Sequence, residues 1–239
     1  MCALLRAAGA TAIAVPAIEI LAPQRTDTLD VALRGLDAWD WVVFTSVNGV
    51  HAVRARCRAL GLGPDLWKRV RVAAVGPATA RSLEVHGIAV AAVPEHYTAA
   101  EIAEATDARA GLRYLLLRGD LAGADLGATL ASCGAHTHEL VAYRTVLRSF
   151  DAAAAARVAG ADAITFTSGS TVRGLMSVLG ERWRAVIGPS LIATIGEATA
   201  AAVRSAGLRV DAQASAATVP SLIAALQKAF AGRRQHATG

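Results

Sequence analysis

The chain repeats one sequence pattern at a nearly constant spacing. Residues 72–80 read VAAVGPATA and residues 192–200 read IATIGEATA, an offset of 120 residues. A second pair, DWVVFTS at residues 40–46 and DAITFTS at residues 162–168, is offset by 122 residues. Self-similarity at a fixed offset indicates one structural unit that occurs twice. Any fold proposed for this chain must therefore contain two related halves.

Each half alternates short apolar runs with longer segments of helical spacing. The runs do not alternate strictly between polar and apolar residues, which is typical of parallel strands that are buried on both faces. Strands that are each followed by a helix predict a doubly wound α/β unit. We expect strands at residues 41–45, 71–75, 88–93, 114–118, 136–141, 163–167, 191–195 and 208–210.

An additional strand is predicted at residues 11–15, and it needs a parallel sheet to join. Too little chain precedes it to build one, so it must pair with strands beyond residue 148. The first domain is then discontinuous, with the second inserted into it. We expect domain 1 at residues 1–16 and 148–239, domain 2 at residues 24–139, and two hinge strands, able to pair as an antiparallel ribbon, at residues 17–23 and 140–147.

The start of the chain is shorter than the repeat requires. A helix remnant at residues 4–8 is closed by Gly9, much as a complete helix at residues 121–132 is followed by Gly134. Aligning the two glycines places the counterpart of the strand at residues 115–118 before Met1. We therefore expect the first strand of domain 1 to be missing, as after a misassigned start codon.

The charge of the chain bears on its partners. Basic residues outnumber acidic ones, 24 to 19, and only Lys68 and Lys228 are lysines. Guanidinium groups bind carboxylates and phosphates through paired hydrogen bonds, so the excess is compatible with an anionic partner, although arginines on solvated helix faces also account for it. The sequence has no basic block beyond Arg233-Arg234 and few aromatic residues to stack bases, so we expect no nucleic acid partner.

Other features bear on the compartment. The sequence contains no apolar stretch long enough to span a bilayer and no visible signal peptide. Its cysteines, Cys2, Cys57 and Cys133, are odd in number and not closely paired, which fits reduced thiols in a cytoplasmic protein. The six histidines show no metal-ligand spacing, so we expect no metal site. Because no apolar stretch could span a bilayer, we also expect no membrane partner.

Four of the predicted strands end in small hydroxyl or glycine residues at the start of a helix. In open parallel sheets, ligands bind beyond the carboxyl ends of the strands, and helix N-termini hold anions with their unpaired N–H groups. The alternative is that these residues only cap their helices, and the two roles can coexist. The candidate binding residues are Ser46, Asn48, Gly76, Thr79, Ser168, Ser170, Gly196 and Thr199.

Two further residues are candidates because of their position. Arg118 lies at the end of a predicted strand, where it could meet a carboxylate of a ligand or pair with Asp120 or Asp125. Tyr143 lies in the middle of the second hinge strand, where it could pack on the hinge or direct its hydroxyl toward a cleft between the domains. The chain contains no glycine-rich nucleotide motif and no Ser-His-Asp signature.

Taken together, these motifs resemble the uroporphyrinogen-III synthase family. The resemblance rests on the two FTS strand ends, the two Gly-x-Ala-Thr-Ala helix starts, LLRG at residues 116–119 and VAYRT at residues 141–145. It extends from Gly9 to about Leu226. It implies two flavodoxin-like domains joined by a two-stranded hinge, with a cleft between them, and a monomer that needs no cofactor.

The reaction implied by the resemblance belongs to tetrapyrrole (haem) biosynthesis. Hydroxymethylbilane, a linear tetrapyrrole polycarboxylate, loses its hydroxyl as water and closes to uroporphyrinogen III with inversion of ring D. By the same resemblance, Tyr143 matches the proposed general acid, Thr79 and Thr199 match threonines that line the cleft, and Ser46 and Ser168 match the strand-end serines.

Two other functions are compatible with the sequence. One is a non-catalytic ligand-sensing module of the same fold, related to a transcriptional regulator, which a winged helix encoded downstream would favour. The other is a periplasmic-type binding protein, which also has two α/β lobes and a hinge. The missing signal peptide argues against the second.

Overall fold

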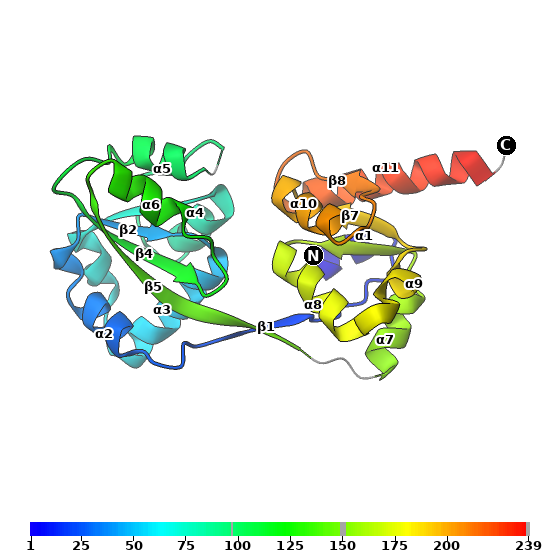
Figure 1. Cartoon of the computed structure of the whole chain (residues 1–239), viewed down its shortest axis with the longest axis horizontal. Helices are drawn as coiled ribbons and strands as arrows, with labels where there is room; N and C mark the ends of the chain where they lie inside the picture. Colours follow the sequence, from blue (N-terminus) through cyan, green and yellow to red (C-terminus); the bar gives the residue numbers. More distant parts are fainter. Residues whose placement is uncertain (97, 149–151, 238–239) are drawn as a thin grey trace. The chain divides into compact units, whose positions relative to one another are not determined.

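The computed structural model describes residues 1–96, 98–148 and 152–237 of the chain. It divides into two compact units: unit 1 comprises Met1–Glu19 and Val146–Gly239, and unit 2 comprises Ile20–Thr145 (Figure 1). Unit 1 is thus built from both ends of the chain, and unit 2 from the continuous segment between them.

The described part of unit 2 is built on a five-stranded sheet with the order β1-β5-β4-β2-β3. The strands are β1 (Ile18–Leu21), β2 (Trp41–Phe44), β3 (Arg71–Ala74), β4 (Arg113–Gly119) and β5 (His136–Leu147). β2 pairs in parallel with β3 and with β4, and β4 pairs in parallel with β5. The predicted α/β fold with a mostly parallel sheet is therefore confirmed.

The outer side of β3 carries one further contact. Ala73 and Ala92 form a parallel bridge, and the N–H of Ala91 donates to the carbonyl of Val72 at 2.8 Å. This bridge is what remains of the strand predicted at residues 88–93. With this bridge included, the order across the sheet is β1-β5-β4-β2-β3 followed by the segment at Ala92. The flavodoxin-like detail of the fold stays a prediction.

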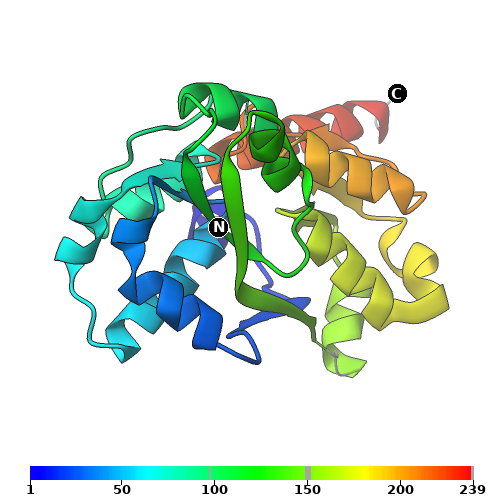
Figure 2. The same cartoon turned by 60° about the vertical axis from the view of Figure 1, so that its left-hand side comes forward.

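Alternate residues of the central strands enter two separate cores, because successive side chains of a strand point to opposite faces. Phe44 packs in the first core with residues of three helices, and Tyr114 packs in the second with residues of two others. The first core is covered by α2 (Asp27–Arg34), α3 (Val47–Ala59) and α4 (Pro77–Glu84), and the second by α5 (Ala99–Ala105) and α6 (Asp125–Ser132). Figure 2 shows this arrangement from a second side.

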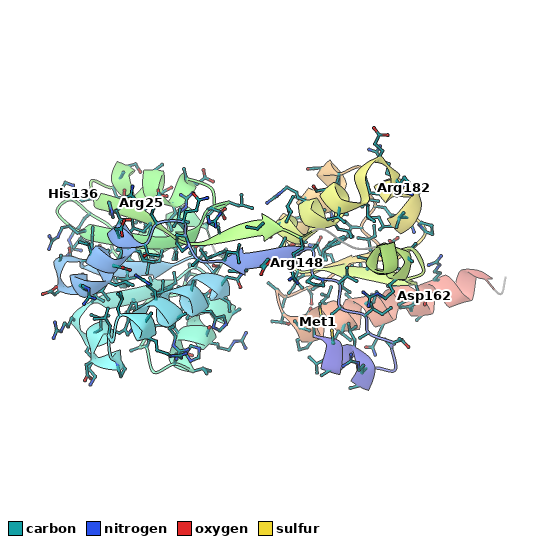
Figure 3. The ribbon with its side chains drawn as sticks, turned by 90° about the horizontal axis from the view of Figure 1, so that it is seen from below. Met1, Arg25, His136, Arg148, Asp162 and Arg182 are labelled. Atoms are coloured by element: carbon teal, nitrogen blue, oxygen red, sulfur yellow. The ribbon has the colours of Figure 1, made fainter. Side chains whose placement is uncertain are left out.

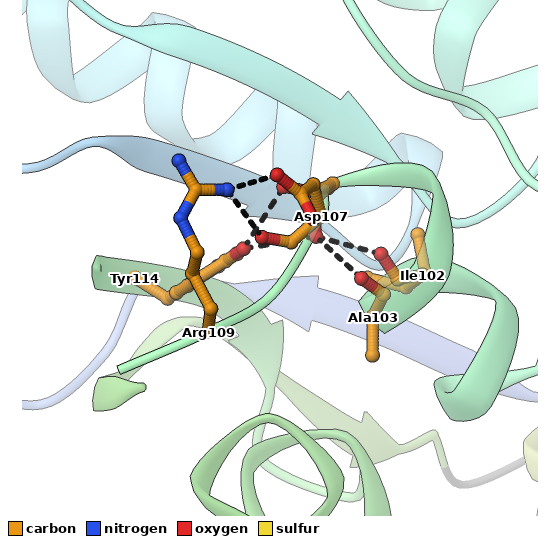
Figure 4. Close-up of polar contacts among 6 residues, drawn as sticks. Ile102, Ala103, Asp107, Arg109 and Tyr114 are labelled. Carbon is orange, nitrogen blue, oxygen red and sulfur yellow. Dashed lines mark hydrogen bonds and ion pairs between the residues drawn. The ribbon is translucent and has the colours of Figure 1, made fainter. Parts of the chain in front are cut away.

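Tyr114 shows how the second core accommodates a polar group. Its hydroxyl donates to Thr106 Oγ1 at 3.0 Å, and Thr106 Oγ1 donates to the carbonyl of Ile102 at 2.7 Å (Figure 4). At the surface beside them, Arg109 pairs with Asp107. Burial raises the pKa of Tyr114 above its usual value of 10.0, and the hydrogen bond with Thr106 acts in the opposite direction. The hydroxyls of Tyr114 and Thr106 therefore each have a partner, which avoids the cost of an unsatisfied polar group at this point.

The described part of unit 1 contains a smaller parallel sheet, with the order β6-β7-β8. Its strands are β6 (Ala163–Phe166), β7 (Leu191–Thr194) and β8 (Ala212–Gln213). Its helices are α1 (Cys2–Ala7), α7 (Ala152–Ala159), α8 (Gly169–Leu179), α9 (Trp183–Ile187), α10 (Glu197–Ser205) and α11 (Val219–Ala237). Ile192 packs with α8, α9 and α10, whereas Leu191 packs with α11, so this sheet is also covered on both faces.

The opening segment of unit 1 corrects one prediction. Residues 11–15, all within the described part of the chain, form no strand. Ile13 is 48% exposed, and only Val15 packs against a core, where it is partly buried. A strand inside a parallel sheet must be covered on both faces, and this segment is not. The strand predicted at residues 208–210 also differs, because β8 lies slightly later, at Ala212–Gln213.

The segments that link the two units run in opposite directions. In unit 1, the N–H of Arg148 donates to the carbonyl of Ala17 at 3.1 Å, and Arg148 Nε lies 3.5 Å from Glu19 Oε2; Arg148 is labelled in Figure 3. In unit 2, Arg144 Nε donates to the carbonyl of Ala22 at 3.3 Å. From Arg148 to Arg144 the residue numbers fall, whereas the numbers of the contacted residues rise from Ala17 to Ala22. β1 and β5, which are neighbours in the sheet, therefore have the contacts of an antiparallel pair.

Candidate functional site

The site in unit 2 begins at the junction of β2 and α3. Ser46 has an extended backbone, with φ −160° and ψ 157°, and its Oγ accepts a hydrogen bond from the N–H of Gly49 at 3.1 Å. This is the predicted helix cap, and it leaves the other N–H groups of the first turn available. Arg56 anchors the same helix to Asp30 of α2 through a 2.6 Å contact from Nε to Oδ1. The hydrogen bond from Arg56 lowers the pKa of Asp30.

Tyr143 reaches this junction from β5. Its hydroxyl oxygen lies 3.0 Å from Ser46 Oγ. The residue is 9% exposed and belongs to the core beneath α3. Sequence position left open whether Tyr143 packs or serves a ligand. In the structure, the ring of Tyr143 packs in the core, and its hydroxyl contacts Ser46, the N-cap residue of α3.

Arg118 has a different partner from those considered. Its guanidinium contacts Glu139 of β5 and the carbonyl of Ala122, so pairing with Asp120 or Asp125 is not what the structure shows. The Arg118 side chain is 17% exposed, and its Nε is buried without a hydrogen-bond partner among the described residues. Gly127 leaves space for this pair, since a Cβ there would overlap the carboxylate of Glu139. Binding of a ligand carboxylate by Arg118 stays a prediction.

The remaining candidates of unit 2 lie in the first turns of α3 and α4. Asn48 is exposed in the first turn of α3. Gly76 precedes α4 as its N-cap residue, with Pro77 as the first helical residue, a favourable position because proline lacks an N–H. Thr79 is 5% exposed. β2 and β3 are adjacent and parallel, so both helix starts lie at the same edge of the sheet.

The candidates of unit 1 repeat this layout. Ser168 caps α8 by accepting a hydrogen bond from the N–H of Thr171 at 3.3 Å. Its hydroxyl lies 2.9 Å from that of Ser170, so here the second partner comes from the helix itself. Gly196 is the N-cap residue of α10, and Thr199 is 5% exposed. The two repeats therefore share the helix cap but differ in what bonds to the capping serine.

Sequence reasoning missed two residues of the unit 2 site. Gly119, the last residue of β4, lies directly against the Tyr143 ring. Glu139 is paired with Leu116 in the register of β4 and β5, and Leu116 lies two residues before Arg118, on the same face of the strand. The only signal for Glu139 was an acidic residue in a predicted strand that neighbours the strand of Arg118, and the register that brings the two together could not be read from the sequence. Gly119 belongs to the LLRG motif at residues 116–119 and ends a buried strand, but neither feature showed that it lies against Tyr143.

The arrangement can supply a proton and bind anions. A phenol can act as a general acid, and helix N-termini stabilise negative charge. Among the described residues, no group of three or more His, Cys, Asp or Glu side chains could hold a metal ion. Nor does any helix in the described ranges combine the length and apolar character needed to cross a membrane.

Comparison with known proteins gives a consistent result. A family model for uroporphyrinogen-III synthase HemD matches residues 1–224. A uroporphyrinogen-III synthase from Synechococcus elongatus is 33% identical, over 94% of this chain and 88% of that protein. A putative uroporphyrinogen-III synthase from Methanothermobacter thermautotrophicus is 34% identical, over 77% of this chain and 74% of its own length.

Solved structures resemble the fold. A uroporphyrinogen III synthase from Thermus thermophilus has a TM-score of 0.65 and 20% sequence identity, with 97% of this chain and 94% of that chain covered. The corresponding enzyme from Helicobacter pylori has a TM-score of 0.63 and 17% identity, with 90% and 91% covered. At these identities the structural likeness concerns the fold.

Proposed function

The chain belongs to the uroporphyrinogen-III synthase family, and on that premise we propose that it closes hydroxymethylbilane to uroporphyrinogen III, with inversion of ring D and loss of water. The observation that supports a chemical role for the site is the 3.0 Å contact between Tyr143 and the capping Ser46. The alternative of a non-catalytic sensing module has no support in these comparisons, because the relatives named above carry the name of the synthase.

Tyr143 is the proposed general acid. When the bond from carbon to the hydroxyl oxygen breaks, the electron pair goes to that oxygen, which takes the Tyr143 proton and leaves as water. The proton released when the macrocycle closes returns to the phenolate. The substrate can close without help to the uninverted isomer, so the protein must chiefly fix its geometry.

The carboxylate arms of the substrate are proposed to bind at the helix starts, where N–H groups and partial positive charge favour anions. Two hydroxyl groups that cap helices, on Ser46 and Ser168, stand at these starts. Arg118 is a weaker candidate, because Glu139 already engages its guanidinium. The proposed binding residues are Ser46, Asn48, Gly76, Thr79, Arg118, Ser168, Ser170, Gly196 and Thr199.

Finer features of the architecture are also proposals. We propose that units 1 and 2 are two doubly wound domains and that residues 17–23 and 140–147 serve as the hinge strands. We further propose that the protein is a monomer and acts without a cofactor. We also propose that it is cytoplasmic, which the free thiols at Cys2, Cys57 and Cys133 support, because cytoplasmic cysteines are kept reduced.

The decisive experiment incubates the purified chain with hydroxymethylbilane and separates the two product isomers. We expect uroporphyrinogen III as the main product, and Tyr143→Phe should lower the rate by about 10 to 100-fold, because one positioned acid typically contributes about 100-fold or more and water can partly replace it. Formation of the uninverted isomer alone, at the spontaneous rate, would remove the proposed function. An unchanged rate for Tyr143→Phe would return that residue to packing.

A further inference from the structure

The position of Tyr143 depends on an irregularity in β5. The parallel register runs from Arg113 opposite His136 to Arg118 opposite Val141, and the next pair is Gly119 opposite Tyr143. Ala142 is therefore an extra residue, which makes a β-bulge. Strand side chains alternate between faces, so Tyr143 would otherwise share the face of Val141, which is 39% exposed. The bulge turns Tyr143 to the same core as Ala142.

Gly119 makes room for the ring on that face. A Cβ at position 119 would lie 2.6 Å from Tyr143 Cζ and 2.7 Å from its hydroxyl oxygen, closer than real contacts of this kind. Any other residue there must displace the ring. The backbone of Tyr143 is held at the same point, because its carbonyl accepts from the N–H of Asp120 at 3.1 Å and Asp120 Oδ1 accepts from the N–H of Thr145 at 2.9 Å.

Ser46 then determines how the Tyr143 hydroxyl is used. Its Oγ accepts the N–H of Gly49, and within the described residues its other partner is the hydroxyl of Tyr143. The proton of Ser46 can thus be donated to Tyr143, which leaves the Tyr143 proton for a different acceptor. After Tyr143 has given up its proton, the hydrogen bond from Ser46 stabilises the resulting phenolate. The N–H of Gly49, in the first turn of α3, donates to Ser46 Oγ and so makes the Ser46 hydroxyl a stronger donor.

From this geometry we infer that Ser46 and Gly119 are positioning residues for Tyr143, an inference that rests on the proposed function. Gly119 leaves the space that the Tyr143 ring occupies, and Ser46 sets the direction in which the Tyr143 hydroxyl donates its proton. Tyr143 remains the catalytic residue. Ser46 acts on the rate through Tyr143, in addition to any contact that it makes with a carboxylate arm.

The test is a double-mutant cycle on kcat with hydroxymethylbilane. We expect Ser46→Ala to lower kcat about 10-fold in the wild type, since a hydrogen bond to a charged group is lost. In the Tyr143→Phe background, the same change should alter kcat less than about twofold, because no phenolate forms. Ser46→Thr, which keeps a hydroxyl, should restore most of the kcat that Ser46→Ala loses. Thr98→Ala, which removes the equivalent cap of α5, should not lower kcat.

Gly119→Ala provides an independent arm. It should lower kcat at least about 10-fold in the wild type and have little effect in Tyr143→Phe. The matched control is Gly63→Ala, whose added Cβ meets no atom within 4 Å and whose φ of −81° suits alanine.

Three results would overturn the inference. Ser46→Ala or Gly119→Ala could lower kcat equally in both backgrounds, or Ser46→Ala could raise only KM. In each case Tyr143→Phe would still be slow, so the proposed function would stand. A Tyr143→Phe variant with the wild-type rate would instead remove the general acid, and the positioning roles with it.

Discussion

Tyr114 and Tyr143 lie on neighbouring strands of one sheet and are nearly alike by burial, at 0% and 9% exposed. Each hydroxyl lies 3.0 Å from another side-chain hydroxyl. The difference is in the partner. Thr106 gives its proton to the carbonyl of Ile102, so Tyr114 must donate to Thr106. Ser46 instead accepts an amide N–H, and its own proton is available to Tyr143.

This difference gives two similarly buried tyrosines different capacities to donate a proton. The proton of Tyr114 is committed within the core, and burial raises the pKa of that group. Tyr143 has a partner that can donate to it, so its own proton can be given away. The chemistry of the second hydroxyl, more than the surroundings of the ring, separates a structural tyrosine from a proton donor.

The largest effect on stability is expected from a substitution of Thr106, the partner of Tyr114. Thr106→Val keeps the shape but removes the acceptor of the Tyr114 hydroxyl, and we expect the free energy of unfolding to fall by about 1 to 3 kcal/mol, with kcat unchanged. Denaturant unfolding measures the first and the isomer assay the second. The double variant Tyr114→Phe/Thr106→Val should lose less stability than the sum of the two single variants, because no hydroxyl is then left unpaired. Full additivity would contradict the proposed pairing.

A second experiment compares the two capping serines. Ser46→Ala and Ser168→Ala each remove a helix cap and should each cost about 1 kcal/mol of stability in denaturant unfolding. Only Ser46→Ala should also lower kcat, because Ser168 bonds to Ser170 and not to a tyrosine. Any kinetic effect of Ser168→Ala should appear in KM. Equal losses of kcat would show that the two repeats are functionally equivalent at this position.

The smallest effect concerns pH. Because burial raises the pKa of Tyr114 above 10.0, the folded chain holds this proton more tightly than the unfolded chain does. The resulting stability is fully present below pH 10 and is lost as pH rises through the folded pKa. Tyr114→Phe should therefore show a shallower loss of stability above pH 10 than the wild type. Identical slopes would mean that Tyr114 titrates as it does in the unfolded chain.

Much of the fold could be predicted because it depends on local patterns. Apolar runs followed by helices identified the parallel strands, and Ser46 and Ser168 could be recognised as caps from their place before a helix. The repeat also placed equivalent residues at equivalent strand ends. These features depend on residues that are close in sequence, so single-chain reasoning reaches them.

The rest depended on register and on neighbours far away in sequence. The bulge at Ala142 arises from the pairing of β5 with β4, and no local motif marks it. The bulge turns Tyr143 toward Ser46, which is 97 residues away in the sequence, so their contact could not be predicted from the sequence alone. The strand predicted at residues 11–15 failed for a related reason: an apolar run becomes a central strand only if other elements cover both its faces.

The discontinuity of unit 1 has a consequence for how the protein is made. The first 19 residues leave the ribosome long before the segment that starts at Val146, with which they form one unit. Unit 2 is continuous and can fold as soon as residue 145 has emerged, since domains generally fold as units during synthesis. Residues 1–19 must wait for that later segment, and helix α1, which has no buried residue of its own, is exposed to proteases and chaperones during that interval.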